Sequence, residues 1–164
     1  MTNYIFQESG FEFDFSGSIN AYKADIPAYD GLSAVDFVVE TEDEYLFIEV
    51  KNPDNIKSRP ESQKQLEDLD EMKQYCSKIA GKFKDSLLKE LAMGVEFSKP
   101  ITCIFILQYG KIDARQKSRI YESINGRIPA FKEDIYKSVK CVKFAKLYNK
   151  EEFFENHAFN IVET

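Results

Sequence analysis

The 164-residue chain is long enough for one folded domain with a substantial core. Its 43% hydrophobic content favours a packed globule over a disordered chain, and its net charge of −6 disfavours a protein that coats nucleic acid nonspecifically. We find no apolar run long enough to cross a bilayer and no signal-peptide pattern in the first residues. Three widely spaced cysteines suit a reducing compartment, so we expect a cytoplasmic protein without membrane association.

The first third of the chain has the residue pattern of β-strands. Phenylalanines alternate with acidic residues over 11–15, which is the period of a half-buried strand. A second strand is predicted over 21–26. Two stronger strands are predicted over 35–40 and 45–51, joined by the acidic turn 41–44.

The rest of the chain is predicted to alternate between helix and strand. Apolar residues recur at steps of three and four over 61–93, which predicts one long helix with Gly81 as the position of a bend and Gly94 as its stop. The remaining predicted elements are a buried strand over 101–107, a helix from Asp113 to Ile124, a strand over 139–148 and a short helix after Asn149. Together these elements predict a single α/β domain over residues 1–164, with a mixed β-sheet flanked by helices.

Two acidic residues and a lysine lie within the apolar strands of the predicted hairpin. A turn over 41–44 pairs residues whose numbers sum to 85, so that Asp36 faces Glu49. Glu49 and Lys51 are two residues apart and therefore point to the same face of the sheet. Lys51 is then a diagonal neighbour of Asp36, roughly 7–8 Å away at Cα, which is within reach of a long side chain.

Two facing carboxylates inside apolar strands repel each other, and a cation bound between them would relieve this repulsion. Like charges directly opposite each other destabilise a sheet by roughly 0.2–1 kcal/mol, and partial burial increases the repulsion. A magnesium or manganese ion removes this conflict because it prefers carboxylate oxygen ligands. A neighbouring lysine can help to deprotonate or orient an attacking water and can offset the charge of a phosphate.

These residues resemble the motif of the PD-(D/E)xK nuclease superfamily, which has the restriction-endonuclease-like fold. The motif has an Asp at the start of one strand and Glu/Asp-x-Lys on the next, and it reads here as Asp36 followed by Glu49-Val50-Lys51, with Val35 in place of the proline. The resemblance implies that Asp36, Glu49 and the backbone carbonyl of Val50 bind Mg²⁺ or Mn²⁺. It also implies that Lys51 assists phosphodiester hydrolysis, so that Asp36, Glu49 and Lys51 form the catalytic set.

The resemblance extends to the order of the elements around the motif. The family core has a helix after the motif lysine and then another strand, as the predicted elements 61–93 and 101–107 provide. Many members also carry a further metal-assisting acid on a helix ahead of the first core strand. This sequence has no clear helix there, and Glu8 and Glu12 are the nearest candidates.

The function implied by the resemblance is metal-dependent hydrolysis of phosphodiester bonds in nucleic acid, with DNA as the expected substrate. Cleavage of both strands of a DNA duplex would favour a homodimer. The alternative is a catalytically inactive member of the fold that binds a protein or a nucleic acid, with the acidic residues 1–50 facing a basic partner. A phosphatase or nucleotide hydrolase is disfavoured because the sequence lacks a glycine-rich phosphate-binding loop.

Charge is unevenly distributed along the chain. Residues 1–50 carry eleven acids and one base, whereas residues 51–164 carry seventeen acids and twenty-one bases. Basic residues of the second part are candidate contacts to a phosphate backbone, although mixed solvated faces also explain them. These candidates are Lys111, Arg115, Lys117, Arg119, Arg127, Lys137, Lys140, Lys143 and Lys146.

Other polar residues near the motif are expected to have ordinary structural roles. Some branches of the family place a glutamine and a tyrosine of the following helix near the metal, and Gln65, Gln74 and Tyr75 follow the motif here at a looser spacing. We interpret these three as surface or core residues. His157 is interpreted as a surface or packing residue rather than a catalyst.

Overall fold

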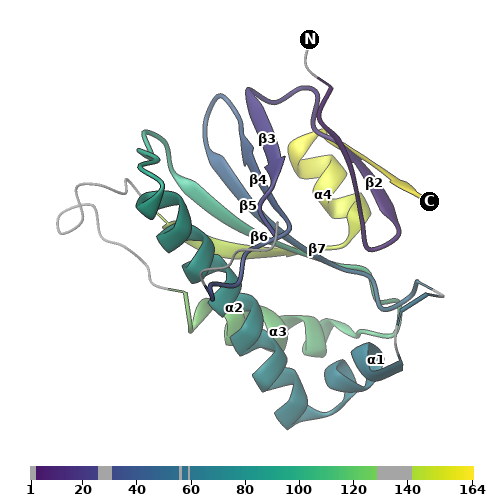
Figure 1. Ribbon diagram of the computed structural model, residues 1–164. Helices are drawn as coiled ribbons and strands as arrows, with labels where there is room; N and C mark the ends of the chain where they lie inside the picture. The colour runs from purple at the N-terminus through teal and green to yellow at the C-terminus, as the bar shows by residue number, and fades with distance from the viewer. Residues whose placement is uncertain (1–2, 26–30, 56, 59, 129–141) are drawn as a thin grey trace.

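The computed structural model describes residues 3–25, 31–55, 57–58, 60–128 and 142–164, which form a mixed α/β fold (Figure 1). Its elements are β1 (Ile5–Glu8), β2 (Phe11–Asp14), β3 (Asn20–Lys23), β4 (Phe37–Glu40), β5 (Tyr45–Lys51), α1 (Pro60–Glu67), α2 (Leu69–Ala92), β6 (Ile101–Leu107), α3 (Ala114–Asn125), β7 (Val142–Tyr148), α4 (Lys150–His157) and β8 (Asn160–Glu163). No helix within these ranges combines the length and the apolar content needed to span a bilayer.

The central sheet has five strands in the order β3-β4-β5-β6-β7. Strands β3, β4 and β5 form an antiparallel meander, whereas β6 and β7 are each parallel to the strand before them. The two parallel connections are long, and they contain α1 and α2 between β5 and β6, and α3 between β6 and β7. A smaller antiparallel sheet has the order β1-β2-β8. The predicted α/β class with a mixed sheet is therefore confirmed.

The register of the β4–β5 hairpin agrees with the sequence prediction. Glu40 pairs with Tyr45 and Val38 pairs with Phe47, so paired residue numbers sum to 85. Asp36 lies directly before the first residue of β4 and is therefore next to the carboxyl end of β5.

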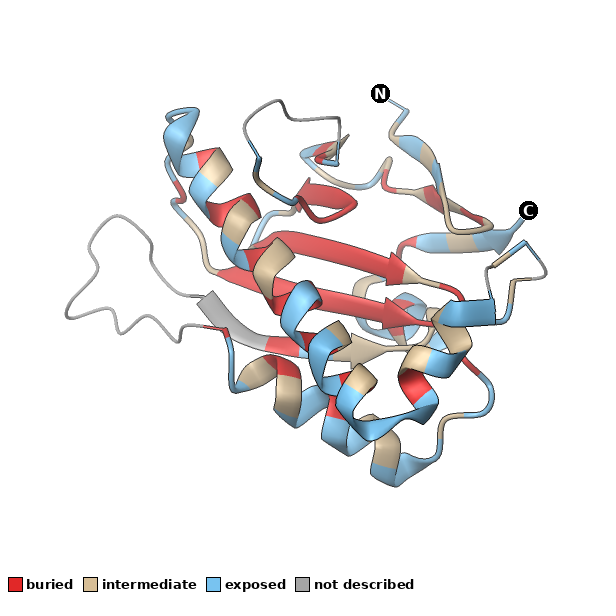
Figure 2. Cartoon of the chain, turned by 60° about the horizontal axis from the view of Figure 1, so that its bottom comes forward, coloured by how far each residue is buried: buried red, intermediate tan, exposed pale blue. Residues whose placement is uncertain are grey.

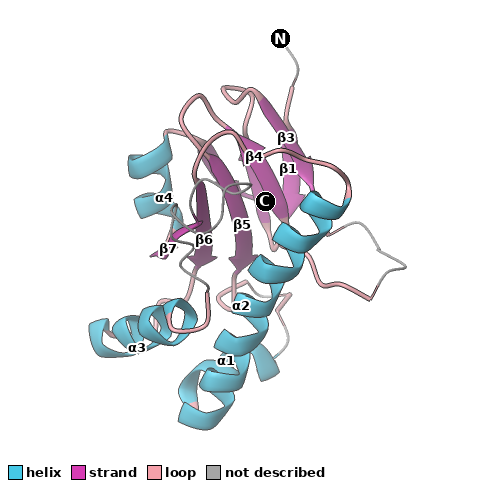
Figure 3. Cartoon of the chain, turned by 90° about the vertical axis from the view of Figure 1, so that its left-hand side faces the viewer, coloured by secondary structure: helices cyan, strands magenta, loops and turns pink. Residues whose placement is uncertain are grey.

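The five-stranded sheet separates two hydrophobic cores, and its central strands are buried along most of their length (Figure 2). On one face, Tyr45 and Phe47 of β5 belong to a core that includes residues of α1, α2 and α3. On the other face, Leu46 and Ile48 belong to a core that includes residues of β2 and α4. Helix α2 runs along the sheet beside β5 (Figure 3). Because side chains alternate along a strand, Glu49 lies on the same face of the sheet as Tyr45 and Phe47, which is the face that α2 covers.

The predicted 61–93 helix is two helices, and the break is at Asp68 rather than at Gly81. The Asp68 side chain accepts hydrogen bonds from the backbone N–H groups of Asp70 and Glu71, so it caps the start of α2. Gly81 lies within α2, whereas Gly94 has a left-handed φ of 82° just after the helix, as its predicted role as a stop requires.

The smaller helices agree better with their predictions than the edge strands do. Asp113 and Asn149 cap α3 and α4 with capping boxes, as their sequence positions suggest. The predicted strand over 21–26 is observed as β3, with Ile26 outside the described residues, and the described part of the 139–148 strand is β7. The short strands β1 and β8 were not predicted.

Candidate metal centre

The three motif residues meet at the carboxyl end of β5. Asp36 and Glu49 are 3% and 0% exposed, and the Lys51 side chain is 33% exposed. The Asp36 Oδ2 atom accepts a hydrogen bond of 2.7 Å from the backbone N–H of Val50. The Lys51 Nζ atom lies 2.7 Å from Glu49 Oε1. The structure therefore brings together the residues that the motif singled out.

A second lysine, which the sequence gave no reason to select, also binds Glu49. Lys82 of α2 places its Nζ atom 2.8 Å from Oε1 and 3.0 Å from Oε2 of Glu49. Lys82 lies three residues after the buried Ile79 and directly before the buried Phe83, so it borders the apolar stripe of α2. The Glu49 carboxylate is thus neutralised by two ammonium groups, which explains how it is tolerated without solvent exposure.

Asp36 is the carboxylate of this pair whose ionised form is disfavoured in the folded protein. Burial, followed by the nearby charge of Glu49, raises the pKa of Asp36 to about 7, although Lys51, Lys82 and the N–H of Val50 act in the opposite direction. Burial lowers the pKa of Lys51, but the charges of Glu49 and Asp36 outweigh burial and raise it overall. Lys51 is therefore protonated at neutral pH, whereas a nearby cation would favour the ionised form of Asp36.

Two further acids approach Asp36. One carboxylate oxygen from each of Glu8, Asp25 and Asp36 lies within 4.8 Å of the other two. Glu8 is at the end of β1, and Asp25 follows β3 by two residues. Lys23 lies 3.0 Å from Glu8 and limits the negative charge of this cluster. Glu8 was one of the two candidates for an additional acid.

The turn between β1 and β2 places Glu8 in this cluster. Ser9 and Gly10 both have positive φ, at 54° and 80°, as a tight two-residue hairpin turn requires. The side-chain amides of Asn52 and Asn55 donate to the Ser9 carbonyl oxygen at 3.1 and 3.3 Å. The loop after the motif lysine is thereby tied to the turn that follows Glu8.

The donor set fits a hard divalent cation such as Mg²⁺ or Mn²⁺. Its members are carboxylate oxygens, and a bound cation would favour the ionised form of Asp36, whose pKa is raised by burial and then by the charge of Glu49. Glu8 and Asp25 are already close to Asp36, whereas Glu49 can contribute an oxygen only if Lys82 moves away from it. The N–H of Val50 is used by Asp36, and the role of the Val50 carbonyl stays a prediction.

Tyr75 of α2 is partly buried against the core, in agreement with the expected surface or core role. Burial and the charge of Glu49 raise the pKa of the Tyr75 hydroxyl well above its usual value. Its ring lies 6.1 Å from that of Phe105, the residue paired with Glu49 across β5 and β6. His157, in contrast, packs against the Phe153 ring at 5.0 Å, in agreement with a packing role.

The candidate phosphate contacts fall into groups with different surroundings. Within the described ranges, Lys111, Arg115 and Arg119 are exposed and form no ion pair. Lys117 is paired with Glu152 at 2.6 Å, and Arg127 donates to the carbonyl oxygen of Ser123 at 2.6 Å. Lys137 and Lys140 lie outside the described residues. Lys143 and Lys146 lie in β7, and Lys146 is exposed.

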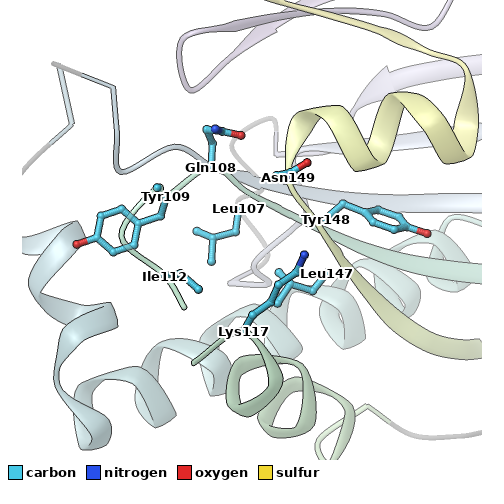
Figure 4. A pocket seen from close by; sticks show the side chains of 9 residues that line it. Leu107, Gln108, Tyr109, Ile112, Lys117, Leu147, Tyr148 and Asn149 are labelled. Atoms are coloured by element: carbon cyan, nitrogen blue, oxygen red, sulfur yellow. The ribbon is translucent and has the colours of Figure 1, made fainter. Parts of the chain in front are cut away.

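A pocket of about 250 Å³ lies beside the motif strand, at the carboxyl ends of β6 and β7 (Figure 4). Leu107 and Leu147 form part of its apolar wall, and Lys117 of α3 reaches across it. The backbone N–H of Gln108, another lining residue, donates to the Lys51 carbonyl oxygen at 2.9 Å. One residue of the pocket wall is thus hydrogen-bonded to the strand that carries Glu49 and Lys51.

Comparison with known proteins identifies no relative. No protein-family model, curated protein or solved structure matches the chain. Inferences about the centre therefore rest on its own geometry and on the motif.

Proposed function

We propose that this chain is a metal-dependent nuclease of the PD-(D/E)xK superfamily, with a restriction-endonuclease-like fold, that hydrolyses phosphodiester bonds in DNA. The observation that carries the proposal is the convergence of Asp36, Glu49 and Lys51 at the carboxyl end of β5. The helix and the parallel strand that follow β5 have the order that the motif leads us to expect.

The acidic residues and the lysine of the centre would have different roles. Asp36 and Glu49, together with Glu8 and Asp25, would hold Mg²⁺ or Mn²⁺, which when bound activates a water and polarises a phosphoryl oxygen. Because its raised pKa keeps it protonated, Lys51 would act as a hydrogen-bond donor and positive charge that orients the water and stabilises phosphate charge. It would not act as the base that accepts a proton.

The exposed cations of the α3 region are proposed to bind the DNA backbone. Double charge reversal, Arg115→Glu with Arg119→Glu, is expected to lower the slope of log K against log salt by about two, since each lost phosphate contact removes about 0.9 from it. Fluorescence anisotropy with a labelled duplex at several salt concentrations measures this slope. An unchanged affinity and slope would show that these arginines are only solvated.

Cleavage assays test the proposed activity. Wild-type protein at pH 8 with Mn²⁺ is incubated with single-stranded, double-stranded and branched DNA, with RNA as a comparison. We expect cleavage of at least one DNA substrate that disappears when the metal is chelated and in Asp36→Asn. Intact substrates throughout the panel would contradict the nuclease proposal.

One observation favours the second candidate, an inactive interaction module. The Glu49 carboxylate is fully paired with Lys51 and Lys82, so this part of the centre is electrostatically satisfied by protein groups alone. If no substrate is cleaved, we propose instead that the acidic N-terminal region of this fold binds a basic partner.

A further inference from the structure

Lys82 occupies the two oxygen atoms that a cation at Glu49 would need. Its Nζ atom lies 2.8 Å from Oε1 and 3.0 Å from Oε2, whereas Lys51 is paired with Oε1 alone. A divalent cation that binds Glu49 must therefore compete with Lys82 for both oxygens.

The two lysines reach Glu49 from different elements of the fold. Lys51 lies on β5 itself, two residues after Glu49, and is paired with the Oε1 atom of that residue. The ammonium group of Lys82 reaches the centre from α2 on a flexible four-carbon stem, and its side chain is 26% exposed. Glu49 is the acid to which it is hydrogen-bonded.

Displacement would leave Lys82 as a partly buried cation without its partner, which is unfavourable unless an anion takes the place of Glu49. We propose that Lys82 is a phosphate-binding residue, held by Glu49 in the metal-free protein and released to the substrate phosphate when a divalent cation binds. This inference rests on the proposed function, because it assumes that a cation and a phosphate meet at this centre.

The proposal predicts that Lys82 has opposite effects on two ligands. In Lys82→Gln, Mn²⁺ no longer displaces an ammonium group, so the Mn²⁺ concentration that gives half of the rise in Tm should fall severalfold. The same variant lacks a charge-assisted bond to phosphate, so its affinity for thymidine 5′-monophosphate in saturating Mn²⁺ should fall about tenfold or more. This nucleotide contains no phosphodiester bond and therefore stays intact during calorimetry.

Lys84→Gln is the matched control. Lys84 is an exposed residue of α2 two positions further on, so it points to nearly the opposite side of the helix. It removes the same charge, and both Mn²⁺ and nucleotide binding should match those of wild type.

The outcomes separate this inference from the proposed function. If wild type responds to Mn²⁺ but Lys82→Gln needs the same or more Mn²⁺, or keeps its nucleotide affinity, Lys82 only orients Glu49 and the inference is wrong while the nuclease proposal stands. If wild type shows no response to Mn²⁺, both fail together.

Discussion

Replacement of Lys51 by alanine is expected to lower the rate of DNA cleavage by about 10²–10³-fold, the range typical of a lost charge-stabilising hydrogen-bond donor. Cation binding should persist, because the cluster of Glu8, Asp25 and Asp36 does not include Lys51. The Mn²⁺-dependent rise in Tm should therefore remain. Single-turnover cleavage and thermal unfolding of the same preparation measure the two quantities.

Lys84→Ala serves as the control for the loss of a lysine, since Lys84 is exposed on α2 and outside the centre. It should cleave at the wild-type rate. Undiminished cleavage by Lys51→Ala would place the catalytic centre elsewhere. A Tm that no longer responds to Mn²⁺ in Lys51→Ala would show instead that the lysine is needed for cation binding.

The second large expected effect is a loss of stability with rising pH that is caused by Asp36. Its pKa is raised from an ordinary value of 3.8 to about 7, so between these values the folded protein holds a proton that the unfolded chain has released. The metal-free protein should therefore lose stability as pH rises from about 4 to about 7. The loss from this group is on the order of 3–4 kcal/mol, at 1.36 kcal/mol for each pKa unit.

Asp36→Asn should remove this contribution, so that the variant is more stable than wild type at pH 8 without metal. Urea unfolding at pH 5 and pH 8 gives the required free energies. Asp43→Asn in the exposed β4–β5 turn is the control, and it should retain the wild-type dependence on pH. If Asp36→Asn destabilises the protein at pH 8, the ionised form of Asp36 is not disfavoured in the folded protein and the expected rise in its pKa is absent.

The local parts of the centre were predictable from sequence. The register of the β4–β5 hairpin follows from the turn length and from the two-residue period of a strand, which together bring Asp36 and Glu49 to the same end of the sheet. The caps Asp113 and Asn149 were likewise predictable, because capping uses backbone groups only three residues away.

The long-range parts were not predictable, because no local pattern specifies them. Lys82 is one of several lysines on α2, and only the packing of that helix against β5 brings its ammonium group to Glu49. Asp25 joins the centre through the end of β3, and Glu8 through a tight turn held by Asn52. The sequence thus suggested two facing carboxylates with a lysine beside them, whereas the structure shows Glu49 paired with two lysines and Asp36 hydrogen-bonded to the Val50 N–H.

The break at Asp68 was missed for a related reason. Leu66 and Met72 are both buried, so the apolar stripe continues across the break and hides it. The strands β1 and β8 escaped prediction because each has four residues and mostly exposed or half-buried side chains, which leaves little alternation to detect.

Direct titration of the purified protein with Mn²⁺ at pH 8 by isothermal calorimetry tests the proposed centre most directly. Wild type should show a saturable heat of binding, and Asp36→Asn should lose it, since Asp36 is shared by the motif and by the acidic cluster. Asp43→Asn should bind as wild type does. A wild type without a binding heat, or an Asp36→Asn variant that binds Mn²⁺ with unchanged affinity, would contradict a metal centre at the carboxyl end of β5.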